Sequence, residues 1–149
     1  MARYRLTTTW VLGTGREQVF AVVRDFERWP EWWPGVEEVR LEGDDMEQVW
    51  RSRLPYAVRF RAVVDAIEPP ELIVGRVEGA LRGTGRCRLT EVDEGTLVEF
   101  ELAVETTEAW MNLVAPLARP VFVWNHDALM RRGGEGIARR LAAPLLSMG

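Results

Sequence analysis

The sequence contains no lysine, one cysteine and one histidine. All 19 basic residues are therefore arginines, and 23 acidic residues outnumber them, which gives a net charge of −4. That balance gives no reason to expect nucleic acid as a partner. The single Cys87 cannot form an internal disulfide and is typical of a reducing compartment, so we expect a cytoplasmic protein.

Chemical motifs are equally scarce. One imidazole excludes a metal site built on histidines, and no nucleophile–base–acid pattern is visible, so the sequence predicts neither metal nor cofactor. The glycines at 83 and 85 do not form a phosphate loop, because they lie in a strand pattern and no helix follows. No apolar run is long enough to span a membrane, and the N-terminus lacks the apolar block of a signal peptide.

What the sequence does contain is alternating apolar and polar residues. Tyr4 to Leu12 alternates with period two, which predicts a strand with one inward face. A short amphipathic helix follows, with Val19, Val22, Val23 and Phe26 on one face. Six further strands are expected, joined by short turns that make neighbours antiparallel. Their expected spans are 39–41, 46–54, 58–66, 72–78, 81–89 and 98–104.

The last third of the chain, from about 108 to 146, has apolar residues at helical spacing. Pro116 and Pro120 predict a kink in its first half. Gly133, Gly134 and Gly136 predict either a break or a close approach of the helix to a flat surface, which we expect to be the sheet.

These elements predict one α+β domain over residues 1–149. A curved seven-stranded antiparallel sheet would wrap around the long C-terminal helix, with two short helices after the first strand. The last strand would lie between the first strand and the fifth strand of the meander. On the outer face, its three glutamates would then meet arginines of both neighbours, namely Glu99, Glu101 and Glu105 with Arg3, Arg5, Arg86 and Arg88.

Seven tryptophans are unusual at this length, and three of them cluster in the second short helix. Trp29, Trp32 and Trp33 have i, i+3, i+4 spacing, so one helical turn brings them to one side. One interpretation is that the indoles cap the core, as buried aromatic residues usually do. The other is that one or two of them line the mouth of a ligand cavity.

Several segments together resemble the SRPBCC, or START-like, superfamily and its polyketide cyclase/dehydrase-like branch. They are the Trp10 strand, Arg28 to Val36, the Glu68-Pro69-Pro70 corner, Gly79 to Gly85, the Gly95-Thr96 hairpin, and 126–137. The resemblance implies a helix-grip fold with a deep, mainly apolar cavity between sheet and terminal helix. Its members bind lipids, hormones and polyketides, and only some are cyclases, so the fold does not choose among these functions. Aromatic polyketide cyclases tend to carry an arginine where this sequence has Leu54.

Polar residues on inward faces are the candidate catalytic groups. His126 and Asp127 lie in the middle of the long helix, and one of them is expected to face the cavity or, alternatively, both lie on the surface. Ser52 shares a strand face with Gln48, and either could orient a ligand or lie near the sheet edge. A histidine in the cavity could move a proton in an enolisation or aldol step. The expected catalytic set is His126, Asp127 and Ser52.

The expected ligand contacts are mostly aromatic. Arg76 belongs to them only if it faces inward with Glu78; if Ile73 and Val77 face inward instead, both charges are solvated. Cys87 is expected to be a small core residue. The expected ligand-binding set is Trp10, Trp29, Trp33, Gln48, Trp50, Phe60, Arg76, Phe100 and Met130.

The expected function is binding of a small hydrophobic molecule, either polyketide-like, lipid-like or aromatic, by a monomer or homodimer. The alternative is a polyketide cyclase or dehydratase that uses acid–base residues in the same cavity. A third possibility is a partner-binding module in which the cavity has collapsed.

Overall fold

The computed structural model describes residues 3–51, 57–107 and 109–149, with side chains from 120 onward in the last helix. The elements follow the expected order, with one strand more than expected. They are β1 (Arg3–Leu12), α1 (Arg16–Arg24), the 3-10 turn η1 (Phe26–Arg28), α2 (Trp29–Trp32), β2 (Val36–Glu42), β3 (Asp45–Arg51), β4 (Ala57–Glu68), β5 (Leu72–Gly79), β6 (Leu81–Val92), β7 (Gly95–Thr106), α3 (Ala109–Leu141) and β8 (Leu145–Met148).

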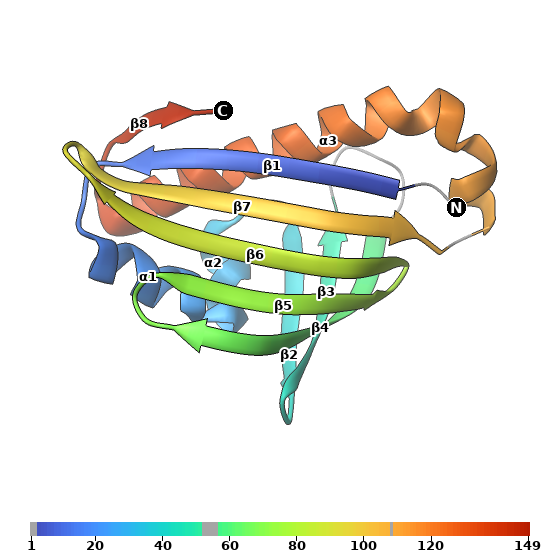
Figure 1. The fold of residues 1–149 in the computed structure, drawn as a ribbon, viewed down its shortest axis with the longest axis horizontal. Helices are drawn as coiled ribbons and strands as arrows, with labels where there is room; N and C mark the ends of the chain where they lie inside the picture. Colours follow the sequence, from blue (N-terminus) through green and yellow to red (C-terminus); the bar gives the residue numbers. More distant parts are fainter. Residues whose placement is uncertain (1–2, 52–56, 108) are drawn as a thin grey trace.

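The strands form one antiparallel sheet in the order β2-β3-β4-β5-β6-β7-β1-β8. β7 lies between β6 and β1, so the predicted strand order is confirmed. The sheet curves, α3 runs along one side of it, and α1 and α2 close one end (Figure 1). This is the helix-grip arrangement, in which the single-sided faces of sheet and helix cover each other.

The eighth strand corrects the expected end of the helix. α3 stops at Leu141, and the next residue, Ala142, has a positive φ of 51° that no helix contains. Pro144 then prevents the helix from continuing, because it has no backbone N–H. The chain turns back instead, and β8 pairs with the end of β1, where Trp10 lies opposite Met148.

The glycines of α3 do not break it, because the helix runs in one piece from Ala109 to Leu141. They allow a close approach, as expected, and the surface they approach is formed by Trp10 of the sheet strand β1 together with Trp33, which follows α2. A Cβ on Gly133 would lie 2.4 Å from the Trp33 ring, and one on Gly134 would lie 2.9 Å from Trp10 Nε1. The helix bends near its N-terminal end (Figure 1), in the half where a kink was expected.

The alternation of the strands places the core as predicted, with one exception. Tyr4, Leu6, Thr8, Trp10 and Leu12 are all buried on β1. On β4, a register shift between Val64 and Ala66 reverses the alternation. Ala66 is therefore exposed, and Ile67 packs against the core in its place. A β-bulge has this effect because its extra residue turns every later side chain to the opposite face.

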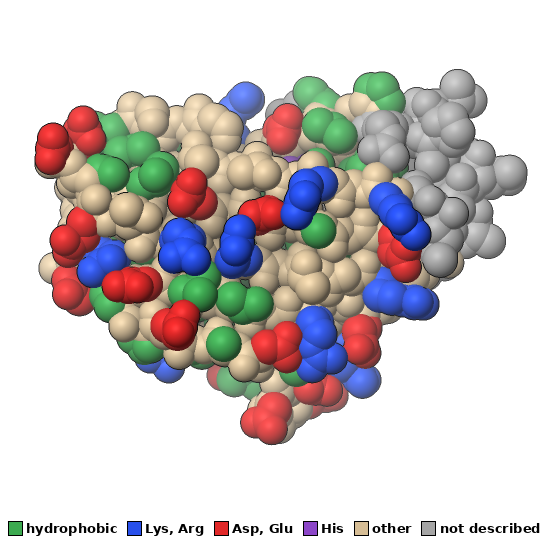
Figure 2. All heavy atoms as spheres, in the orientation of Figure 1, with side chains coloured by type: hydrophobic (Ala, Val, Ile, Leu, Met, Phe, Trp, Pro, Cys, Tyr) green, Lys and Arg blue, Asp and Glu red, His purple; other side chains and the backbone are tan. Residues whose placement is uncertain are grey.

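The outer face of the sheet carries interspersed arginines and acidic residues (Figure 2). Glu101 of β7 contacts Arg5 of β1 at 3.1 Å and Arg86 of β6 at 2.6 Å. Glu105 contacts Arg3 at 3.6 Å and Arg82 at 4.0 Å. The predicted ladder is thus confirmed for Glu101 and Glu105. Glu99 lies opposite Arg88 in the register, but no ion pair joins these two side chains.

Candidate functional site

A cavity of about 250 Å³ lies between the inner face of the sheet and α3. Strands β3 to β7 supply most of its wall, the helical turn at 26–29 closes one end, and α3 supplies the opposite side. Eight of the nine residues expected to contact a ligand border it. They are Trp29, Trp33, Gln48, Trp50, Phe60, Arg76, Phe100 and Met130.

The aromatic rings of this wall contact each other, edge to face between Trp33 and Trp50 and in tilted arrangements elsewhere. The Trp33 and Trp50 centroids are 5.0 Å apart at 67°, and Trp50 continues to Phe60 at 6.3 Å. Trp33 also contacts Phe100 at 6.0 Å. Such contacts favour one arrangement of the rings, so the wall is preorganised before any ligand enters. Of the tryptophan cluster, Trp32 is buried in the core, as the first interpretation expects, whereas Trp29 and Trp33 also border the cavity.

Two indoles are tied to the backbone of α3. Trp33 Nε1 donates to the Leu129 carbonyl at 2.9 Å, and Trp10 Nε1 donates to the Met130 carbonyl at 3.0 Å. Gly133 and Gly134 lie four residues beyond these carbonyls, and their missing side chains leave room for the two rings. The two glycines therefore allow both the close approach of α3 and the hydrogen bonds that the two buried indole N–H groups donate to it.

Trp10 does not border the cavity, so its expected contact with ligand needs correction. It is fully buried and packs behind the wall, 4.7 Å from Phe100 and 5.5 Å from Trp33 between ring centroids. Its size and its donor group serve to support these two rings.

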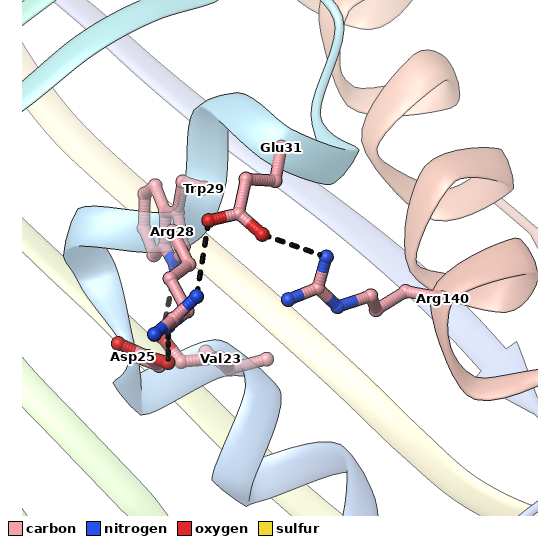
Figure 3. A network of polar contacts seen from close by, with 6 residues as sticks. All are labelled: Val23, Asp25, Arg28, Trp29, Glu31 and Arg140. Carbon is pink, nitrogen blue, oxygen red and sulfur yellow. Dashed lines mark hydrogen bonds and ion pairs between the residues drawn. The ribbon is translucent and has the colours of Figure 1, made fainter.

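Ion pairs hold the Trp29 turn against α3 (Figure 3). Glu31 accepts from Arg140 of α3 at 3.0 Å and from Arg28 at 3.3 Å, and Arg28 also pairs with Asp25 at 3.1 Å. Trp29 Nε1 donates to the Val23 carbonyl at 2.9 Å. The ring that closes one end of the cavity is thus fixed from two sides.

Of the two glycines Gly83 and Gly85 on β6, only Gly85 leaves room in the cavity. It borders the cavity, and a Cβ there would meet nothing closer than Leu102 Cδ1 at 3.7 Å. Gly83 has a φ of +157°, and a Cβ would lie 2.0 Å from the Ala103 carbonyl oxygen. Gly83 is therefore required by the close backbone of β7 and does not enlarge the cavity.

The polar groups at the cavity come from opposite walls. Gln48 of β3 is buried, and its Oε1 accepts from Trp50 Nε1 at 2.8 Å. His126 of α3 borders the cavity, and its Nδ1 is buried without a hydrogen bond, 3.6 Å from Asp127 Oδ1. Burial lowers the pKa of His126, and the neighbouring carboxylate only partly opposes this shift.

The expected catalytic set does not converge on the cavity. The Asp127 side chain is 60% exposed and does not border it, whereas His126 does. Ser52 and Leu54 lie outside the described residues.

Arg76 borders the cavity with β5, but its guanidinium points to the outer face. There it contacts Asp65 of β4 at 3.0 Å, and the carboxylate raises the pKa of the arginine. Ile73 is buried, so the interpretation with Ile73 and Val77 inward is the one that the structure shows. Cys87 is buried, as expected, and burial raises the pKa of its thiol, which makes it a poor nucleophile.

The sequence interpretation missed three residues of α3 that border the cavity, Phe122, Asn125 and Leu129. Repeated steps of four residues back from Ile137 lead to Leu129 and Asn125, and the same steps back from Met130 lead to Phe122, so helical spacing would have found this face. That face excludes Val121 and Trp124, which are about half exposed.

Within the described part of the chain, no cluster of three or more histidine, cysteine, aspartate or glutamate residues could hold a metal ion. None of the helices described here is both long enough and apolar enough to cross a membrane.

Comparison with known proteins agrees with this geometry. Residues 4–144 match the family described as "Polyketide cyclase / dehydrase and lipid transport". The Zhui aromatase/cyclase from Streptomyces sp. R1128 superposes with a TM-score of 0.74 at 14% identity, over 95% of this chain and 93% of that one. A START superfamily protein from Mycobacterium smegmatis gives 0.72 at 14% identity, over 94% and 97%.

A third structure is the di-domain ARO/CYC StfQ from the steffimycin biosynthetic pathway, with a TM-score of 0.70 at 15% identity. The match covers 94% of this chain but 52% of StfQ, so the chain spans about half the length of that protein. No curated protein matches the sequence.

The fold and cavity define a START-like helix-grip protein. The chain belongs to the polyketide cyclase/dehydrase and lipid transport family.

Proposed function

We propose that this protein binds a small, flat, hydrophobic molecule in the cavity between its sheet and α3. The observation that carries the proposal is a preorganised space of about 250 Å³ with a wall of aromatic and aliphatic side chains. Well-packed cores rarely contain such a void. A cavity of about 150 Å³ accepts benzene, so this one suits roughly two fused rings. An aromatic or polyketide-like metabolite fits that shape better than an extended lipid chain.

The wall gives such a molecule a substantial driving force. Burial of about 250 Å² of aromatic surface contributes roughly 6 kcal/mol before the cost of association. Because the indoles of Trp33, Trp50 and Trp29 are already held in place by hydrogen bonds, little side-chain freedom is lost on binding. We expect dissociation constants between about tens of micromolar and about one millimolar, because roughly 6 kcal/mol before the cost of association is less than the roughly 8 kcal/mol that a micromolar constant requires.

Titration with a bicyclic aromatic probe tests the proposal, with tryptophan emission as the readout because Trp50 borders the cavity. Gly85→Leu should abolish saturable quenching, since the new side chain projects into the cavity from a position without backbone strain. The matched control is Thr84→Leu, which places the same side chain on the exposed face of the same strand. Trp50→Phe should reduce the amplitude of quenching. Equal binding by the two leucine variants would contradict the proposal.

The second candidate function is a cyclase or dehydratase, and His126 is the observation that favours it. A neutral imidazole with an unpaired Nδ1 beside the cavity could accept a proton from a polyketone. Exposure of Asp127 argues against a catalytic pair. His126→Ala should abolish turnover of a poly-β-ketone analogue if the protein is an enzyme. We expect the same products with and without the wild-type protein, as for a carrier or sensor.

A further inference from the structure

The hydrogen bond between Trp50 and Gln48 fixes which end of the Gln48 amide is available. An indole N–H can only donate, so the amide oxygen must face Trp50 Nε1, as it does at 2.8 Å. The NH₂ group is then the other end of the amide, in a residue that is 5% exposed and borders the cavity. In the described part of the chain, Nε2 of Gln48 donates to no other residue. An acceptor bound in the cavity can therefore take this hydrogen bond.

The charged groups around the cavity are all turned away from it. Arg86 and Glu101 border the cavity with their strands, but they pair with each other at 2.6 Å on the outer face. The guanidinium of Arg76 pairs with Asp65 on the same face. Among the described residues, no cationic side chain therefore points inward. Of the described side chains that border the cavity, the remaining titratable ones are those of His126 and Cys87.

We propose that the ligand is a neutral aromatic ketone whose carbonyl oxygen accepts a hydrogen bond from Gln48 Nε2, and that the cavity rejects carboxylates of the same shape. This inference rests on the proposed binding function and names its ligand class. A carbonyl satisfies the buried donor without bringing a charge. A carboxylate would lose its hydration with only one hydrogen bond and no counterion in return. Trp50 acts as the positioning residue, since its N–H holds the amide in the required orientation.

Three naphthalenes of nearly identical shape test this by calorimetry. 2-Acetylnaphthalene carries the acceptor, 2-isopropenylnaphthalene replaces the carbonyl oxygen by a methylene group, and 2-naphthoate replaces the ketone by a carboxylate. We expect the wild-type protein to bind the ketone about tenfold more tightly than the alkene. Binding of naphthoate should be weaker than that of the alkene.

Gln48→Met keeps the length of the side chain and removes both hydrogen-bonding groups. The variant should bind the alkene as well as the wild type does and should bind ketone and alkene equally. Trp50→Phe leaves Gln48 in place but frees its amide to rotate, so its preference for the ketone over the alkene should lie between that of the wild type and that of Gln48→Met. Because Trp50 also borders the cavity, the ratio of ketone to alkene affinities is the readout of this second variant, and it keeps the inference testable if Gln48→Met fails to fold.

The outcomes separate the two proposals. If none of the three probes binds, the proposed binding function is wrong. If the ketone and the alkene bind equally to the wild type, or if Gln48→Met keeps the preference, binding stands but the assignment of Gln48 is wrong. Tight binding of naphthoate would overturn the exclusion of anions.

Discussion

Replacing Gly133 by alanine tests the packing of α3 on the tryptophans. Alanine is the better helix former by about 1 kcal/mol, so propensity alone predicts a more stable protein. The structure predicts the opposite. The added Cβ would lie 2.4, 2.6 and 2.8 Å from three atoms of the Trp33 indole, where ordinary contacts begin near 3.4 Å.

The size of the destabilisation depends on whether the Trp33 ring can move away from the added methyl group. Its ring is 1% exposed, and its Nε1 donates to the Leu129 carbonyl, one turn before Gly133, so it cannot move without straining that hydrogen bond. Overpacking of a filled core destabilises by about 1–3 kcal/mol, and a weakened buried hydrogen bond adds roughly 1 kcal/mol. After the gain in propensity, the free energy of unfolding should fall by about 1–3 kcal/mol. For a chain of this size, Tm should drop by roughly 3–10 °C.

Thermal unfolding followed by circular dichroism measures this change. The matched control is Gly85→Ala, which meets nothing closer than 3.7 Å and has no positive φ. It should leave Tm unchanged or raise it slightly, because alanine restricts the unfolded chain. A Gly133→Ala variant more stable than the wild type would refute the close approach of α3 to Trp33.

Two further predictions concern pH. Burial lowers the pKa of His126 below its ordinary 6.5, so below pH 6.5 the unfolded chain takes up a proton that the folded state resists, and the free energy of unfolding should decline. Urea unfolding at about pH 7.5 and at about pH 5.5 measures this decline, which should be smaller in His126→Gln than in the wild type. Arg86, with help from Arg5, lowers the pKa of Glu101 below its ordinary 4.5, so its contribution is present above pH 4.5 and is lost as pH falls through the lowered value. Glu101→Gln should remove that acid dependence and lower Tm only slightly at neutral pH, and the difference in Tm between variant and wild type should vanish in about 1 M salt. If the variant keeps its lower Tm at high salt, the ion pairs are not the cause of the difference.

The fold could be predicted from the sequence because its cause is local. Period-two alternation in β1, β6 and β7 assigned the inner face correctly, and charge complementarity across β7 supported the strand order. The errors lie where a local pattern meets a tertiary constraint. The bulge at Ala66 reverses an alternation that the sequence continues, and β8 forms because Pro144 ends the helix.

The site was predicted only in part, for a related reason. Period two identifies residues that face inward but does not say whether they meet a void or another ring. Trp10 and Trp50 both face inward, yet Trp10 is sealed behind Phe100 and only Trp50 reaches the cavity. The role of Gly133 depends on a ring that is 100 residues away in the sequence. Contacts of that kind are set by the packing of helix on sheet.

A crystal structure of the protein soaked with 2-acetylnaphthalene tests the central claim most directly. The account predicts density for the ring system between Trp50, Phe60 and Phe100, with the carbonyl oxygen within hydrogen-bond distance of Gln48 Nε2. An interior filled by side chains, with no density between the sheet and α3 and the probe bound elsewhere or not at all, would contradict it and leave the partner-binding module as the interpretation of the fold.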